Sequence, residues 1–341
     1  MARLRPALIR AAAVILILLL LGGVAIWTGV QGIAPRTSLS DVLAPFRGPT
    51  TGSLSWKVEH HQRVNLLLMA RGGAGADNPN FTDTMVVVSM RPPSQEAILI
   101  SLPRFAWVPI PALTSGEVSG KLYSAYALAV HPDNASLRPA WRTTTGAGDL
   151  AAATIAQLIG LPIDGWVVID INGFRDVVDA LGGITVSVPR ALDDPAYPVD
   201  DIDRTTHIYI AAGTQRLDGE HALEYARSRR STSETDRSER QQLLLTAIAT
   251  RLHHLSVGPS LLFLLGALQG RLLTNLHPSD ARQLAAAVDH VSATQIHRLT
   301  VDESNFVYAQ PEPGGDEVLM PRDGSYAGLR RYISALLAGQ S

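Results

Sequence analysis

Short apolar runs alternate along this chain with longer stretches whose apolar residues recur at helical spacing. The first three runs, at 64–70, 85–90 and 97–102, are almost continuously apolar, which is typical of strands buried on both faces of a sheet. A strand at 166–171, a helix at 174–181 and a strand at 184–188 then follow the order of a crossover unit. We therefore predict an α/β fold with a central, mainly buried β-sheet that is flanked by helices on both faces.

Similar patterns predict the elements of the second half of the chain. Helices are expected at 149–159, 261–273, 281–291 and 326–337, and strands at 297–301 and 317–320. The apolar part of 261–273 is too short to span a bilayer, so a helix packed in the core is expected there.

The N-terminus carries a different pattern, an uncharged and largely apolar run from Ala11 to Val30 that follows Arg3, Arg5 and Arg10. This run has about the length that a transmembrane helix needs, and positive charge before it places the N-terminus in the cytoplasm. A cleaved signal peptide is the alternative, but the run is long for one. We predict a single-pass protein of the cell membrane: cytoplasmic residues 1–10, an anchor at 11–30, a spacer at 31–61 rich in Gly, Pro, Ser and Thr, and an extracytoplasmic α/β domain at 62–341.

Composition narrows the function. The chain has 341 residues, a net charge of −2 and no cysteine, which excludes disulfides, Cys-ligated zinc and thiol nucleophiles. Near-neutral charge gives no support for nucleic-acid binding, so an anion site would have to be local. Arginine supplies nearly all the positive charge, since Lys57 and Lys121 are the only lysines.

The densest local charge is an arginine-rich stretch within 217–250, where two helix-like segments meet around a polar loop. Arg227 and Arg229 end the first segment, and Glu234, Arg237 and Arg240 are each three residues apart at the start of the second. Planar, always-charged arginines are suited to bidentate binding of phosphate oxygens, and a nearby carboxylate suits a divalent cation. The alternative is a solvated helix start held by ion pairs.

Other candidate polar groups lie at strand ends. Asp83 stands before a buried strand and is either a turn residue or a ligand, and Arg104 follows a strand that Pro103 ends. Glycines near 72–75 are not followed by Gly-Lys-Ser/Thr, so a nucleotide P-loop is excluded. The acidic run at 193–203 is expected to be a solvated loop.

Taken in order, these motifs resemble the LytR-CpsA-Psr family of cell-wall glycopolymer transferases, most strongly over 62–255. The resemblance is carried by Asn65-Leu-Leu-Leu, Thr82-Asp-Thr, Ser101-Leu-Pro-Arg, Lys121 with Ala125-Tyr126, Asp164 to Phe174, Asp179-Ala-Leu-Gly-Gly-Ile-Thr-Val, Leu217-Asp-Gly-Glu, Tyr225-Ala-Arg-Ser-Arg and Arg237-Ser-Glu-Arg-Gln-Gln.

The resemblance implies a membrane-anchored phosphotransferase that moves a polyprenyl-(di)phosphate-linked glycopolymer onto a hydroxyl of a peptidoglycan-type wall polymer, with Mg²⁺ as cofactor. It implies catalytic roles for Asp83, Arg104, Arg227 and Arg237, and substrate-binding roles for Arg229, Arg240, Lys121, Glu234 and Gln241. It implies a metal site at Asp83.

The chain departs from the family pattern at three positions. The second metal aspartate of the family falls at Gly72, so that Asp77 either replaces it or metal binding is weakened, an acidic residue is replaced by Phe105, and an aspartate by Glu234. Two alternatives therefore stay open: a catalytically weakened polyprenyl-phosphate-binding or regulatory protein, and a lipid-diphosphate phosphohydrolase that uses water in place of the sugar hydroxyl.

Overall fold

A computed structural model of the chain describes most of the predicted α/β domain. The described residues are 52–72, 79–92, 96–131, 133–198, 204–228, 234–253, 271–277, 280, 283–284, 296–312 and 317–339. The predicted cytoplasmic segment and anchor at 1–30 lie outside them. Within the described ranges, no helix is both long enough and apolar enough to cross a bilayer.

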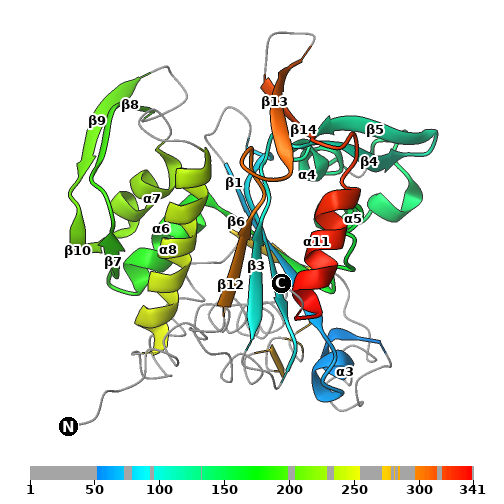
Figure 1. Ribbon diagram of the computed structural model, residues 1–341, viewed down its shortest axis with the longest axis horizontal. Coiled ribbons are helices and arrows are strands. Elements are labelled where there is room, and N and C mark those ends of the chain that lie inside the picture. The colour runs from blue at the N-terminus through cyan, green and yellow to red at the C-terminus, as the bar shows by residue number, and fades with distance from the viewer. Residues whose placement is uncertain are drawn as a thin grey trace.

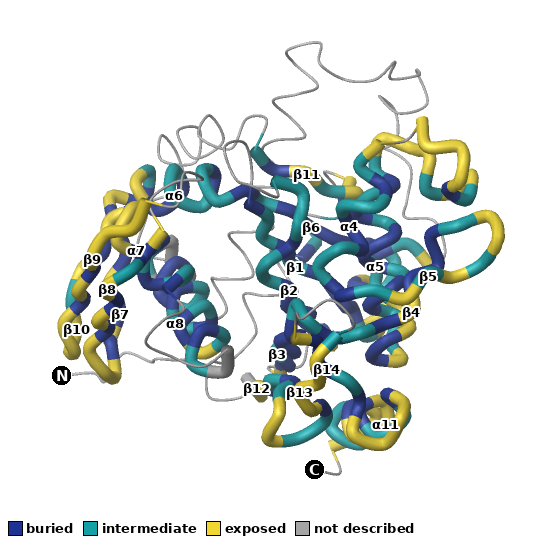
Figure 2. Tube along the Cα trace, turned by 90° about the horizontal axis from the view of Figure 1, so that it is seen from above, coloured by how far each residue is buried: buried dark blue, intermediate teal, exposed yellow. Residues whose placement is uncertain are grey.

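The centre of the fold is a six-stranded mixed sheet. In spatial order it contains β11 (Leu272–Thr274), β6 (Gly165–Asp170), β1 (Val64–Arg71), β2 (Thr82–Met90), β3 (Ala97–Ser101) and β12 (Ile296–Thr300). β1 is parallel to β6 and β3 is parallel to β12, whereas the other neighbours are antiparallel. Figure 2 shows the sheet in this order, with helices on either side. The predicted central sheet is confirmed.

Two cores cover the two faces of this sheet because its inner strands are apolar at almost every position. Leu66 and Val88 enter the first core, while their neighbours Leu67 and Val87 enter the second. The helices with side chains in the first core are α3 (Leu54–Glu59), α6 (Ile171–Ala180), α7 (Gly219–Arg227) and α8 (Glu234–His253). Those with side chains in the second core are α4 (Ser124–Leu128), α5 (Gly146–Ile159) and α11 (Ala327–Leu337). In Figure 1, α6, α7 and α8 stand on the opposite side of the sheet from α4, α5 and α11, while α3 lies below α11.

Within the described ranges, four two-stranded ribbons lie around the sheet. They pair β4 (Trp107–Leu113) with β5 (Gly116–Lys121), β7 (Ile184–Val188) with β10 (Gly213–Leu217), β8 (Leu192–Pro198) with β9 (Thr205–Ile210), and β13 (Val307–Pro311) with β14 (Glu317–Pro321). A short 3₁₀ turn, η2 (Pro139–Trp141), precedes α5.

The predicted crossover unit is wrong, because β7 does not join the sheet that contains β6. Gly182 and Gly183 adopt φ values of 69° and 88°, and the chain then pairs antiparallel with β10. The physical reason lies in the burial pattern of β7, which alternates between buried and exposed positions. Such a strand covers a core with one face, whereas the inner strands of this sheet need two apolar faces.

Three further expectations change. Residues 272 and 273, predicted as the end of a helix, belong to β11, which pairs with β6, while 261–270 lie outside the described residues. The predicted acidic loop contains strand β8, and Asp194 within it is fully buried. Helix α3 falls inside the range expected as a spacer, and its Leu54 and Val58 are buried in the first core.

Candidate active site

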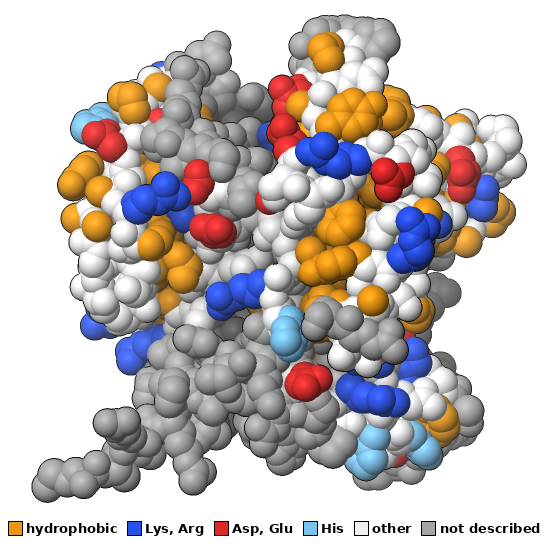
Figure 3. Space-filling view, viewed as in Figure 1, with side chains coloured by type: hydrophobic (Ala, Val, Ile, Leu, Met, Phe, Trp, Pro, Cys, Tyr) orange, Lys and Arg blue, Asp and Glu red, His pale blue; other side chains and the backbone are white. Residues whose placement is uncertain are grey.

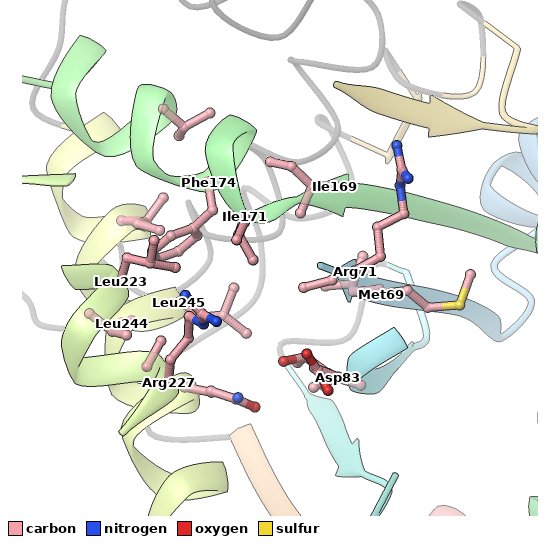
Figure 4. A pocket seen from close by; sticks show the side chains of 18 of the residues that line it. Met69, Arg71, Asp83, Ile169, Ile171, Phe174, Leu223, Arg227, Leu244 and Leu245 are labelled. Carbon is pink, nitrogen blue, oxygen red and sulfur yellow. The ribbon is translucent and has the colours of Figure 1, made fainter. Parts of the chain in front are cut away.

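A largely apolar pocket opens on the first-core side of the sheet, between strands β1, β2 and β6 and helices α6, α7 and α8. Its walls are formed by aliphatic and aromatic side chains, among them Leu68, Val86, Val167, Ile169, Ile171, Phe174, Val177, Leu223, Leu244, Leu245, Ile248 and Leu272. Its polar lining comes from Arg71, Asp83, Thr84, Arg227, Arg237 and Gln241. In Figure 4, Asp83 and Arg227 lie on opposite sides of the space, and Phe174 and Leu223 form part of its apolar wall.

Strand direction explains why polar groups gather at one end of this pocket. β1 and β6 are parallel and end together, since Arg71 pairs with Asp170 across the two strands. β2 is antiparallel and begins where β1 ends, since Arg71 also pairs with Thr82. Asp83 therefore belongs to a strand rather than to the turn before it. Its side chain is 35% exposed.

Two of the predicted arginines converge on Asp83. The Arg104 guanidinium forms an ion pair with the Asp83 carboxylate, and Nη2 of Arg237 donates a hydrogen bond of 3.3 Å to the Asp83 carbonyl oxygen. Arg104 also lies over the ring of Phe105, with its guanidinium carbon 4.2 Å from the ring centroid. Its buried Nε donor has no hydrogen-bond partner among the described residues. Buried donors normally have a partner, which makes this atom an exception.

Arg227 approaches from the other side of the pocket. It is the last residue of α7, and its guanidinium carbon lies 5.9 Å from the ring centroid of Tyr197. Burial raises the pKa of the Tyr197 hydroxyl, and the charge of Arg227 opposes that rise. Gln241, on α8, lines the same space. Predicted site residues from β2 and from helices α7 and α8 are thus brought into one pocket.

Arg240 has a different environment, although its spacing from Arg237 suggested a shared role. It is buried, and its Nε and Nη2 donate to the carbonyl oxygens of Tyr225 (2.7 Å) and Ser228 (2.5 Å) at the end of α7. These carbonyls are ones that a helix C-terminus leaves without an intrahelical partner. Burial lowers the pKa of the Arg240 guanidinium, with Asp194 and other nearby acidic groups opposing the shift. Arg240 therefore supports the segment that presents Arg227.

The remaining predicted site residues are placed as follows. Nζ of Lys121 forms an ion pair of 3.1 Å with the Glu312 carboxylate, and lies 5.8 Å from the ring centroid of Phe105. Glu234 begins α8, but its side chain is not among those described. Arg229 and Asp77 lie outside the described residues.

The structure adds a charged pair that the sequence pattern did not indicate. Nη2 of Arg71 lies 3.9 Å from the carboxylate of Asp170, which caps α6 by accepting a 2.7 Å hydrogen bond from the Gly173 amide. In Figure 4 the Arg71 side chain points away from Asp83. The sequence does show that both residues stand where an apolar run ends. It does not show that they are neighbours, because only the pairing of β1 with β6 brings them together.

Asp83 supplies the carboxylate among the residues that line the pocket, and magnesium is the cation expected there. No group of three His, Asp or Glu side chains that could hold a metal occurs in the part of the chain that the structure describes. Mg²⁺, however, is often bound by one or two carboxylates together with substrate phosphates and water. The partly exposed Asp83 carboxylate at the pocket fits that smaller donor set.

The geometry suits an amphiphilic anion. Apolar walls can hold a hydrocarbon chain, and the arginines provide charge-assisted donors for phosphate oxygens. Oxygens bound between Arg227 on one side and Arg104 and Arg237 on the other would be held in a fixed orientation.

Curated relatives carry similar sequences. TagV of Bacillus subtilis, a polyisoprenyl-teichoic acid–peptidoglycan teichoic acid transferase, is 31% identical over 173 residues, which cover 50% of this chain and 39% of TagV. TagT of the same organism, with the same described activity, is 28% identical over 219 residues, covering 64% of this chain and 61% of TagT. The chain thus spans less than two thirds of the length of either relative.

The fold matches solved structures and the sequence matches a family model. The crystal structure of Bacillus subtilis TagV aligns with a TM-score of 0.60 at 23% identity, covering 82% of this chain and 98% of that one. A structure described as TagT bound to LIIa-WTA aligns with the same TM-score at 22% identity, covering 85% of this chain and 95% of that one. The LytR_cpsA_psr family model matches residues 46–314. The arginines and Asp83 lie within that range, and the chain belongs to the LytR_cpsA_psr family.

Proposed function

We propose that this protein transfers a glycopolymer from a polyprenyl diphosphate carrier to a hydroxyl of a peptidoglycan-type wall polymer. The observation that carries the proposal is the pocket itself, in which apolar walls lead to Asp83, Arg227 and Arg237. The family membership and the activity named for TagV and TagT support it.

In the substrate complex, the hydrocarbon chain lies against the apolar walls and the diphosphate lies among the arginines. Arg227 binds it from the side of α7, and Arg104 and Arg237 bind it from the side of Asp83. Because the arginines are fixed by their own contacts, they neutralise the phosphates without large rearrangement.

The reaction replaces the phosphoanhydride bond of the diphosphate with a phosphoester bond to the acceptor. The acceptor oxygen forms a bond to the phosphorus that carries the glycopolymer, and the bridging P–O bond breaks. Polyprenyl phosphate leaves with the electron pair and takes up the proton that the hydroxyl loses. A magnesium ion held by Asp83 and the phosphates would supply further neutralisation of the departing group. Asp77, expected as a second ligand, remains a prediction.

The test is transfer of a labelled, lipid-linked glycopolymer to purified wall fragments. Arg227→Ala should lower turnover and lipid retention by about tenfold to a hundredfold, because a hydrogen bond to a charged group is worth about 1.5–3 kcal/mol. The matched control is Arg190→Ala, since Arg190 is 77% exposed and pairs with Asp236. Equal activity of the two variants would refute the assignment of the pocket.

The same assay tests the role of Asp83 and distinguishes transfer from hydrolysis. Asp83→Asn should lower turnover more than lipid retention, and a chelator should have the same effect on the wild type. Unchanged transfer in chelator would remove the metal from the mechanism. Label released into solution, with none on the wall fragments, would indicate a phosphohydrolase instead.

A further inference from the structure

A strip of aromatic and polar side chains runs along the β13–β14 hairpin and α11 toward Asp83. It consists of Tyr332, Phe306, Tyr308, Gln310 and Glu312, and is called the hairpin strip below. We propose that the hairpin strip binds the acceptor polysaccharide and guides its hydroxyl to the diphosphate. This inference rests on the proposed function and names a second binding surface for it.

The hairpin strip is exposed and has one orientation along β13. Tyr308 and Gln310 are two residues apart, so they share a face of the strand, and the Tyr308 hydroxyl bonds Gln310 Oε1 at 3.2 Å. Tyr308 is 40% exposed and Tyr332 is 45% exposed. Phe306 continues the strip to α11, since its ring centroid lies 5.4 Å from that of Tyr332. In Figure 3, hydrophobic side chains reach the surface over α11 and beside the hairpin.

The other end of the strip reaches the site. The Glu312 carboxylate pairs with Lys121, whose ammonium faces the ring of Phe105, and the same ring carries Arg104. The hairpin is fixed there by its backbone, because the amide of Leu319 donates a 2.9 Å hydrogen bond to the carbonyl of Phe105. The seven residues from Phe306 to Glu312 are separated by six steps, which extend about 20 Å at strand spacing. The strip therefore connects α11 to the Asp83–Arg104 pair.

The position of the hairpin strip relative to the pocket favours the acceptor, and not the lipid-linked donor, as the molecule that the strip binds. The lipid pocket lies on the first-core side of the sheet, whereas Phe306 and Phe105 pack against the second core. In phosphoryl transfer the attacking and leaving oxygens are roughly in line. With the departing lipid phosphate on the pocket side, the attacking hydroxyl comes from the side of the hairpin strip.

The side chains suit a sugar chain. Aromatic rings have a negative face that attracts the polarised C–H groups of a pyranose ring, and amide and carboxylate groups exchange hydrogen bonds with sugar hydroxyls. Alternation of rings with Gln310 and Glu312 provides both contacts along one line. The family model ends at residue 314, so β14 and α11 lie beyond its match. Part of this surface is thus outside the segment that defines the family.

The test compares two exposed-tyrosine variants. Tyr308→Ala combined with Tyr332→Ala should lower binding of the protein to purified wall fragments at least tenfold and raise the KM for those fragments. Retention of polyprenyl diphosphate and the thermal midpoint should stay at wild-type values. Tyr209→Ala is the matched control, because Tyr209 is 62% exposed on β9 and is not part of the strip. Gln310→Ala provides a second, milder variant and should weaken wall binding in the same direction.

Each alternative gives a distinct result. Unchanged wall binding in the double variant would overturn the inference. Loss of binding to delipidated glycopolymer, with wall binding intact, would assign the strip to the donor and also overturn it. Wall binding needs no transfer chemistry, so a wild-type protein that binds wall fragments through the strip but transfers nothing would refute the proposed function alone.

Discussion

Replacing Arg240 with alanine should destabilise the protein far more than replacing a neighbouring arginine of equal charge. Arg240 is 6% exposed and bonds two carbonyl oxygens at the end of α7. The hydroxyl of Ser228, whose carbonyl is one of these acceptors, also donates to Asp194 at 2.6 Å, and Asp194 is fully buried. The guanidinium therefore satisfies buried acceptors and opposes a buried negative charge.

The magnitude follows from these contacts. Removing one partner of a buried charged network leaves an uncompensated charge and costs about 3–5 kcal/mol. The control, Arg190→Ala, also breaks an arginine–carboxylate pair, at 2.6 Å, but Arg190 is 77% exposed. An exposed pair contributes about 0–1 kcal/mol because water and salt screen it. The expected losses of stability in Arg240→Ala and Arg190→Ala therefore differ because Arg240 is buried and Arg190 is exposed.

The assay is urea denaturation of the purified protein, followed by circular dichroism. Arg240→Ala should shift the midpoint strongly, and Arg190→Ala should shift it little, both with an unchanged slope. Arg240→Lys should fall between them, because lysine keeps the charge but lacks the planar fork that reaches both carbonyls. Equal shifts for the two alanine variants would refute the structural role of Arg240. A loss of lipid binding without loss of stability would restore its role as a substrate ligand.

Two further predictions concern pH and topology. The hydrogen bond to Asp218 raises the pKa of the His221 imidazole, so this pair stabilises the fold fully below the ordinary histidine pKa of about 6.5 and less as pH rises through the raised value. The difference in thermal midpoint between wild type and His221→Gln should therefore be larger at pH 5.5 than at pH 9, and a larger difference at pH 9 would contradict it. The arginines before the 11–30 segment predict an outward-facing domain. Protease added to spheroplasts should digest that domain, whereas complete protection would reverse the topology.

The sequence by itself determined the features that depend on local pattern. Continuous apolar runs predicted the inner strands of the sheet, because a strand covered on both faces has no polar face. The pattern within 217–250 predicted two helices, which the structure contains as α7 and α8, and Asp218 caps α7 through a local side-chain interaction. The ordered motifs identified the family.

Tertiary structure decided how residues with similar patterns are used. Arg237 and Arg240 stand three apart on one helix, yet one lines the pocket and the other bonds the end of α7, because the partners of each come from distant segments. The sequence predicts β7 as a strand after a helix, but its partner β10 is a segment farther along the chain that the local pattern does not indicate. Arg71 and Asp170 become a pair only when β1 and β6 align. Local propensities fix elements, whereas long-range pairing and burial decide which charged groups face a ligand.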